Sequence, residues 1–371
     1  MDNDEKKYWL GFSAFPGIGP LRFALLLKFF KTAQKAWEAK REKLLEIGLG
    51  EKLTESFCAF RMSFSLKDYI ELLNKKSIRV LTLKDSTYPK LLKEIAAAPF
   101  VLYIRTDGEI AFDDERNIAV VGTRKITSYG REVTARLTRD LVAFGCTIVS
   151  GMAYGVDTVA HHTAIESGGR TIAVLGCGVD VIHPQSNTPL YWNIVRKYGM
   201  VISEFPAGQY ASKGLFPARN RIISGLSRGV LVTEGAEDSG ALITARCAVE
   251  QGREVFAIPG PITSSLSAGP AKLLKQGAKL VAKVEDILEE LNIRNMQINK
   301  LSNRQMDESM IELSIEERKI LEILQNENMH FDEIIRRTGL ESAKLGGLLT
   351  VLEMKGIVKN FGAGMFGWKR R

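Results

Sequence analysis

The chain has 371 residues, 45% of them hydrophobic and 25% charged, and its 51 basic and 43 acidic side chains give a formal net charge of +8. This apolar fraction excludes a disordered protein, and 33 glycines with 11 prolines exclude a collagen-like or low-complexity one. No apolar run approaches the roughly 20 residues that span a bilayer and the first residues lack a signal-peptide pattern, so we expect a cytoplasmic protein without membrane insertion.

Apolar residues follow helical periodicity to about residue 110, and residues 1–87 are predicted to form a helical domain. Between two helical stretches of this region, residues 15–20 have the sequence Phe-Pro-Gly-Ile-Gly-Pro. A Gly-hydrophobic-Gly turn is typical of helix-hairpin-helix modules, whose main-chain amides meet the DNA backbone. A simple corner that packs two helices together is an equally good interpretation.

From about residue 111 to residue 291, short β-branched runs alternate with stretches long enough for one helix each. The runs are Ile118–Val121, Thr147–Val149, Thr171–Leu175, Met200–Ile202, Gly229–Val232 and Glu254–Ile258. Strands that are apolar throughout and alternate with helices indicate a parallel sheet covered by helices on both faces.

Residues 292–312 are rich in Asn, Gln, Met and Ser and are predicted to be a linker. A capping-box pattern, Ser314-Ile-Glu-Glu317, then precedes an apolar-periodic helix. Residues 313–371 continue as three short helices and a Gly-rich, aromatic hairpin at residues 359–368. This arrangement predicts a winged helix-turn-helix domain.

Glycine-containing turns follow several of the predicted strands, at the edge where ligands of an open parallel sheet bind. Glycine lets a main-chain amide approach a phosphate, and the helix dipole favours the anion by about 0.3–1 kcal/mol. The residues are Gly122, Thr123 and Arg124, then Ser150 and Gly151, then Gly176 and Gly178, and finally Ser239 and Gly240. Four such turns on one edge indicate a site for a polyanion or a nucleotide.

Two common nucleotide motifs and a zinc site are disfavoured. No Gly-Lys-Ser/Thr sequence follows a predicted strand, and Gly176-x-Gly178 lacks the third glycine of a dinucleotide fingerprint. The cysteines at positions 58, 146, 177 and 247 match no metal-binding spacing, so we expect free thiols. We therefore expect no cofactor and no metal.

The densest basic cluster lies at residues 213–221, ahead of a predicted helix. It interleaves cations with a ring and an amide, in the residues Lys213, Gly214, Phe216, Arg219, Asn220 and Arg221. Single-stranded nucleic acid needs cations for its phosphates and a ring face for a splayed base, whose stacking contributes about 1–3 kcal/mol. A helix entrance with solvated arginines and Phe216 in the core is the alternative at this point.

Two pairs of titratable residues have more than one interpretation. Asp157 and His161 lie one helical turn apart, and we favour a structural hydrogen-bonded pair over a metal site or an acid–base dyad. Glu204 and Glu234 each follow a predicted strand, as a hydrolytic carboxylate pair would. They could equally order loop amides or pair with the arginines of residues 219 and 221.

The central region closely resembles DNA-processing protein A, the DprA/Smf family. The motifs that carry the resemblance occur in family order through nearly all of residues 88–291. They are Val121-Gly-Thr-Arg124, Ser150-Gly-Met-Ala-Tyr-Gly-Val-Asp157, Thr171-Ile-Ala-Val-Leu-Gly-Cys-Gly-Val-Asp180 with His183-Pro184, Ser203-Glu-Phe-Pro206, Phe216-Pro-Ala-Arg-Asn-Arg221, Ser239-Gly-Ala-Leu-Ile-Thr-Ala245 and Gly252-Arg-Glu-Val-Phe-Ala-Ile-Pro-Gly260. The flanking helical and winged-helix regions also match the family layout, less specifically.

This resemblance implies an α/β fold with an extended Rossmann-like sheet in residues 88–291. It further implies a homodimer without catalytic activity that binds single-stranded DNA, protects incoming strands and loads the RecA recombinase during natural transformation. The family's DNA pocket corresponds here to Arg124, Lys213, Phe216, Arg219, Asn220 and Arg221, with further contacts from Ser150, Gly151, Ser239 and Gly240. The winged helix is almost neutral, so we assign it a partner-binding or modest DNA role.

Two competing hypotheses remain. Similar sheets occur in nucleotide-binding phosphoribohydrolases, and Glu204, Glu234 and the turn at residues 239–245 would suit a nucleoside monophosphate. That enzyme would release free base. A regulator of duplex DNA would instead act through the winged helix, and residues 1–291 would then bind DNA less well than the whole chain.

Overall fold

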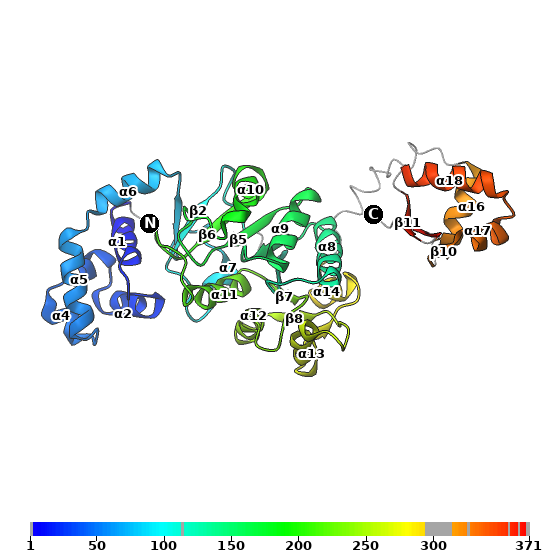
Figure 1. Cartoon of the computed structure of the whole chain (residues 1–371). Coiled ribbons are helices and arrows are strands. Elements are labelled where there is room, and N and C mark those ends of the chain that lie inside the picture. The colour runs from blue at the N-terminus through cyan, green and yellow to red at the C-terminus, as the bar shows by residue number, and fades with distance from the viewer. Residues whose placement is uncertain are drawn as a thin grey trace. The chain divides into compact units, whose positions relative to one another are not determined.

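The computed structural model describes residues 3–112, 115–293, 314–324, 327–354, 357–362 and 364–368. The chain divides into two compact units, Met1–Met296 and Gln297–Arg371, each described by itself (Figure 1). The predicted linker at residues 292–312 lies almost wholly outside the described residues. Within the described ranges, no helix has both the length and the apolar character needed to cross a membrane.

The first unit begins with six helices around an aromatic core. They are α1 (Asn3–Ala14), α2 (Pro20–Phe30), α3 (Ala33–Glu38), α4 (Arg41–Glu46), α5 (Glu51–Ser63) and α6 (Leu66–Lys75). The rings of Phe12 and Phe57 stack with centroids 5.1 Å apart, and those of Phe23 and Phe100 with centroids 4.0 Å apart. Because Phe100 directly precedes a strand of the sheet, the helices share one apolar core with the sheet's edge.

A nine-stranded, mostly parallel sheet forms the centre of the same unit, in the order β1-β2-β6-β5-β4-β3-β7-β8-β9. The strands are β1 (Arg79–Thr82), β2 (Val101–Arg105), β3 (Asn117–Val121), β4 (Thr147–Ser150), β5 (Thr171–Val174), β6 (Gly199–Ser203), β7 (Gly229–Val232), β8 (Glu254–Ala257) and β9 (Lys279–Leu280). All six predicted runs are strands, and the α/β fold class is confirmed.

The sheet also extends into the region that was expected to be helical. Strands β1 and β2 pair antiparallel with each other, and β2 pairs antiparallel with β6. The sheet therefore begins at Arg79, before the predicted boundary at residue 88, and its β1–β2 edge is not parallel. The sequence of β2, Val-Leu-Tyr-Ile-Arg, is rich in β-branched and aromatic residues, which favour a buried strand.

Helices cover both faces of the sheet, as the apolar strands require. They are α7 (Lys90–Lys93), α8 (Ser128–Ala143), α9 (Val156–Glu166), α10 (Thr188–Asn193), α11 (Leu215–Gly225), α12 (Gly240–Glu250), α13 (Ala268–Lys275) and α14 (Glu285–Glu290). Successive residues of β3 alternate between the two cores: Ala119 and Val121 pack with α11 and α12, whereas Ile118 and Val120 pack with α8, α9 and α14.

The strand order reverses at β3, which has β4 on one side and β7 on the other. From β3 the chain proceeds outward through β4, β5 and β6, and it then returns to start again at β7. The turns that follow β3 and β7 therefore diverge at the carboxyl edge of the sheet. Such a topological switch point is the position where doubly wound sheets bind ligands.

The second unit is a winged helix, as predicted. It contains α16 (Ile315–Leu324), α17 (Phe331–Thr338) and α18 (Ser342–Met354), with a sheet of β10 (Met329–His330), β12 (Met365–Trp368) and β11 (Val358–Gly362). The predicted capping box forms, because Ser314 N donates to Glu317 Oε2 at 2.7 Å and Glu317 N donates to Ser314 Oγ at 3.2 Å.

Candidate nucleic-acid interface

A cavity of about 480 Å³ lies at the switch point between β3 and β7. It is lined by residues that lie far apart in the sequence but follow neighbouring strands. Eight of the predicted site residues line it: Gly122, Arg124, Lys213, Phe216, Arg219, Asn220, Ser239 and Gly240. The fold thus brings together the glycine turns and the basic cluster, which the sequence could only place on the same edge.

The Phe216 ring is a wall of this cavity and is only half-buried. The Arg124 guanidinium lies over it, with Cζ 5.2 Å from the ring centroid, and the His183 ring lies beside it at 5.6 Å. A Cβ at position 176 would come within 3.0 Å of Phe216 Cδ1, so glycine allows the ring to lie close to the β5 turn. Phe216 is therefore not a core residue, and its ring and Arg124 form one surface.

Arg219 is buried to all but 4% of its surface, yet it lines the cavity. It shares one face of α11 with Ile222 and Ile223, and its guanidinium packs directly over Gly151, where any side chain would overlap it. Burial lowers the pKa of Arg219, and the negative charge of Asp157 opposes that change. Its Nε has no hydrogen-bond partner among the described residues, so the cavity floor holds a buried cation with unused donor capacity.

Asp157 has a different partner from the predicted one. Its Oδ2 accepts the amides of Gly151 at 3.1 Å and Ala153 at 3.2 Å, which fixes the loop after β4. Burial raises the pKa of Asp157, and Arg219 opposes the rise. His161 is instead hydrogen-bonded to Thr171, with 2.7 Å between Nδ1 and Oγ1, and burial lowers its pKa to about 3. The predicted Asp157–His161 hydrogen bond is not formed.

The remaining predicted residues shape the turns and do not line the cavity. Thr123 N donates to the carbonyl of Glu234 at 2.8 Å, and Ser150 Oγ donates to that of Val120 at 2.6 Å. Gly151 lies beneath Arg219, and Gly214 is exposed just before α11. The hydrogen bonds of Thr123 and Ser150 therefore fix the turns that carry the lining residues.

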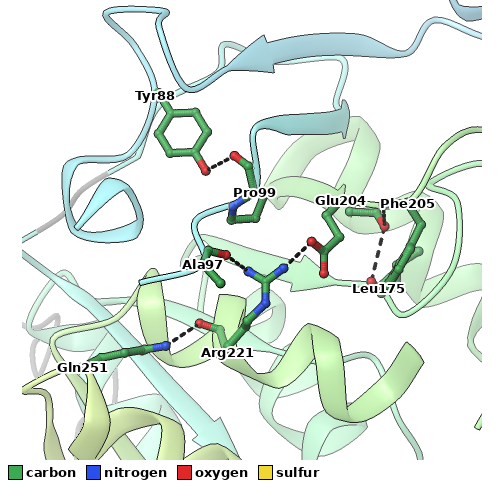
Figure 2. Close-up of polar contacts among 9 residues, drawn as sticks. Tyr88, Ala97, Pro99, Leu175, Glu204, Phe205, Arg221 and Gln251 are labelled. Atoms are coloured by element: carbon green, nitrogen blue, oxygen red, sulfur yellow. Dashed lines mark hydrogen bonds and ion pairs between the residues drawn. The ribbon is translucent and has the colours of Figure 1, made fainter. Parts of the chain in front are cut away.

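Arg221 also points away from the cavity. Figure 2 shows its guanidinium between two partners: Nη1 donates to the carbonyl of Ala97 at 2.6 Å, and Nη2 forms an ion pair with Glu204. The Gln251 side chain donates to the Arg221 carbonyl at 3.0 Å. Burial raises the pKa of Glu204, and Arg221 opposes the rise. Arg221 thus ties α11 to the segment before β2 and to the end of β6.

Glu234 likewise has a structural role. Its Oε2 accepts the Thr127 amide at 3.0 Å, and its Oε1 accepts the Thr127 hydroxyl at 2.6 Å, at the start of α8. Gly130 is required there, since a Cβ would overlap the Glu234 carboxylate. Of the two interpretations left open for Glu204 and Glu234, the structure supports ordering of loops and pairing with an arginine.

Neither a disulfide nor a metal cluster is found in the described ranges. All four cysteines are free thiols. No group of three or more His, Cys, Asp or Glu side chains in those ranges could hold a metal ion. The Phe15–Pro20 turn lines a separate cavity of about 370 Å³ together with Phe205 and Leu215.

Sequence reasoning did not single out two contributors to the main cavity. Asp157 lines it beside Arg219. His183 does not line it but contributes indirectly, because its ring lies beside that of Phe216. His183 lies in the segment that follows β5, so its position at the carboxyl edge was a usable signal. Asp157 was paired with the wrong neighbour, because helical spacing alone cannot show that its carboxylate turns back to the β4 loop.

The model of the DNA recombination-mediator protein A family matches residues 79–292. This match covers more than half of the chain. The chain belongs to that family. A second model, the DprA winged helix domain, matches residues 305–362.

Members of this family from several bacteria are similar to the chain over most of its length. Protein Smf of Synechocystis is 34% identical, over 96% of this chain and 97% of that protein. DNA processing protein DprA of Bacillus subtilis is 44% identical, over 60% of this chain and 74% of that protein.

Two solved structures of the family are also similar. The X-ray structure of DprA from Streptococcus pneumoniae is 34% identical, with a TM-score of 0.66 over 78% of this chain and 98% of that one. A structure on the single-stranded DNA binding mode of DprA from Helicobacter pylori is 29% identical, with a TM-score of 0.51 over 58% of this chain and 95% of that one.

Proposed function

We propose that this protein binds single-stranded DNA in the cavity at the β3–β7 switch point. The observation that carries the proposal is the contact between Arg124 and Phe216, which joins an exposed cation to a half-buried ring at the end of two neighbouring strands. A phosphate and a splayed base can engage this pair at the same time. The H. pylori relative, for which a single-stranded DNA binding mode is described, supports the same ligand.

The other lining groups complete a site for a polyanion. Lys213 is exposed at the rim, and Arg219 supplies a buried positive charge at the floor. Ser239 and Gly240 begin α12, whose eleven residues direct the positive end of a helix dipole toward the cavity. Asn220 adds an amide that can bond to a base edge. Cations, ring and amides in this arrangement bind a strand with little dependence on its sequence.

From family membership we further propose that the protein acts on DNA without catalysis. In this role it protects incoming strands as a homodimer in the cytoplasm and transfers them to the RecA recombinase during natural transformation. The division into a helical domain, a DNA-binding domain and a winged helix belongs to the same proposal, with the DNA-binding domain extended to Arg79 so that it contains the whole sheet. Gel shifts with recombinase added after the DNA test the transfer step.

The phosphoribohydrolase-like alternative has less support. It needs Glu204 and Glu234 as free carboxylates, and both hold structural hydrogen bonds and lie outside the lining of the main cavity. Incubation with nucleoside monophosphates tests it. Release of free base that Glu234→Gln abolishes would replace DNA binding by an enzymatic function.

Removal of the exposed cations at the cavity tests the DNA-binding proposal directly. For the double variant Arg124→Ala/Lys213→Ala we expect weaker binding of single-stranded oligonucleotides and a log–log salt slope that is smaller by about 1.4, since each phosphate contact contributes roughly 0.7. Lys67→Ala/Lys75→Ala on α6 is the matched control, because it removes the same charge from another exposed surface. Unchanged affinity in the Arg124/Lys213 variant would refute the proposal.

A further inference from the structure

A second group of cations and rings lies at the opposite edge of the sheet. The π-helical turn Ile194–Tyr198 directly follows α10 and directly precedes β6. Since β6 runs from Gly199 toward the carboxyl edge, this turn lies at the amino edge, away from the main cavity. Arg105 ends the antiparallel strand β2 and pairs there with Val201. The group, which we call the amino-edge cluster, consists of Arg105, Trp192, Arg196, Lys197 and Tyr198.

Two guanidinium groups lie on one indole in this cluster. Arg105 Cζ is 4.6 Å from the Trp192 ring centroid, and Arg196 Cζ is 5.4 Å from it. The Lys197 ammonium also lies over a ring, 5.2 Å from the centroid of Tyr198. Arg196 and Lys197 both belong to the π-helical turn that follows Trp192. Such i→i+5 turns occur frequently at functional sites. The turn thus gathers three cations around two rings.

None of these three cations is neutralised by a carboxylate of the described residues. No ion pair joins Arg105, Arg196 or Lys197 to an acidic side chain within the part of the chain that the structure describes. The exposed Asp107 is close along the backbone, where its amide donates to the Val195 carbonyl at 2.8 Å, yet its carboxylate forms no such pair. Three unpaired cations in one place favour an anionic ligand.

The stacking prepares the guanidinium groups for phosphates. An arginine on an aromatic face keeps its in-plane N–H donors free, and its rotamer freedom is already reduced before a ligand arrives. Arg105 is fixed further by a hydrogen bond of 3.5 Å to the Tyr191 hydroxyl. Arg196 and Lys197 are exposed, whereas Trp192 and Tyr198 are half-buried. The surface therefore presents charge outward and supports it with rings from below.

From this geometry we infer that the amino-edge cluster is a second binding site for the phosphate backbone of single-stranded nucleic acid. An acidic peptide fits less well, because peptide interfaces depend on large apolar anchors and none of the large exposed apolar side chains in the described ranges belongs to this cluster. Cations interleaved with rings are instead the pattern of single-strand binding surfaces. The inference takes its ligand class from the proposed function but uses residues on the opposite edge.

Charge reversal at the two exposed cations tests the inference. For Arg196→Glu/Lys197→Glu in the full chain we expect weaker binding of a long oligothymidylate and a salt slope smaller by about 1.4, from the loss of two phosphate contacts at roughly 0.7 each. Arg196→Lys/Lys197→Arg should retain most of the slope. Lys67→Glu/Lys75→Glu changes the net charge equally on α6 and should leave binding at this edge intact.

Photocrosslinking to the same oligonucleotide supplies a second readout. In the wild-type protein we expect crosslinks in a peptide that contains residues 192–198, and the charge-reversed variant should lose them. Wild-type affinity, slope and crosslinks in that variant would overturn the inference, as would binding of a polyglutamate peptide at the cluster with no competition from the oligonucleotide. Weaker binding in Arg124→Ala/Lys213→Ala together with wild-type binding in Arg196→Glu/Lys197→Glu would refute only the second site. A wild-type protein that binds no oligonucleotide would refute the proposed function.

Discussion

The carboxyl-edge cavity and helix α17 of the winged helix differ in how their cations are paired. In the cavity, Arg124 contacts a ring and Lys213 is exposed at the rim, and no ion pair joins either of them to a carboxylate in the described ranges. In the winged helix, Arg336 pairs with Glu333, and Arg337 pairs with both Glu327 and Glu333. Unpaired cations attract a distant phosphate, whereas paired ones contribute little.

Helix α18 of the winged helix also has a cation that is paired with a carboxylate. A winged helix reads DNA through an exposed helix, yet Lys344 on α18 is paired with Glu316 at 2.5 Å. Two glycines, Gly346 and Gly347, occupy the middle of α18, where a side chain would meet nothing within 4 Å. The comparison shows that the number of basic residues in a region does not identify a nucleic-acid surface. What matters is which cations lack a partner.

Arg221 provides the strongest test, since it is a paired cation within the cavity's own helix. For Arg221→Ala we expect the free energy of unfolding to fall by about 3–5 kcal/mol, because the Glu204 side chain, only 12% exposed, would remain without its partner. Urea denaturation measures the change. The folded fraction should bind DNA almost as well as the wild type does.

A paired replacement separates the lost charge pair from lost packing. Arg221→Met/Glu204→Leu removes both charges and should be closer to wild-type stability than Arg221→Ala. If Arg221→Ala instead kept full stability but lost DNA affinity, the rule that paired cations are structural would be wrong.

Phe216 tests the ring rather than the charge. Phe216→Ala should weaken single-stranded DNA binding by the stacking contribution of about 1–3 kcal/mol. The salt slope should change little, because no phosphate contact is removed directly. Fluorescence anisotropy at several salt concentrations measures both quantities, and Phe216→Trp should retain the affinity. A smaller slope with unchanged affinity would argue against stacking.

The smallest effect is expected in the winged helix. Arg336→Ala/Arg337→Ala should leave both the affinity for single-stranded DNA and its salt slope at wild-type values, because each arginine already has a carboxylate partner. The same titration measures it, with the Arg124/Lys213 variant as the positive control. A salt slope reduced as much as in that control would show that paired arginines also bind phosphates, and the distinction between paired and unpaired cations would be wrong.

Much of the fold was predictable because buried parallel strands are apolar throughout. Each of the six β-branched runs is a strand, and the helix that follows β3 begins where Thr127 and Ser128 suggest a cap, with Thr127 Oγ1 accepting the Gly130 amide at 3.0 Å. Strands β1 and β2 were missed because they lie among helices and pair antiparallel at the edge of the sheet, β2 with the distant β6. The β6 partner of β2 is distant in the sequence, so the local hydrophobic periodicity does not indicate that the two strands pair.

The candidate site divides in the same way. One feature of the site was predictable from the sequence but was not predicted. Arg219 lies three and four positions before Ile222 and Ile223, on the helical face that packs on the sheet. That spacing predicts a buried arginine. For Arg221, by contrast, no local pattern indicates that Glu204 and the Ala97 carbonyl are its partners, because both come from other elements.

By itself the sequence determined the elements and the chemical content of one edge: which runs are buried strands, where glycine turns follow them, and that cations and a ring occur together at residues 213–221. Only the tertiary structure decided which of those cations reach the cavity and which are paired, and only it joined Arg105 to the turn at Trp192. Propensity and periodicity depend on neighbours along the chain, whereas the pairing of a charge depends on groups that folding brings close in space.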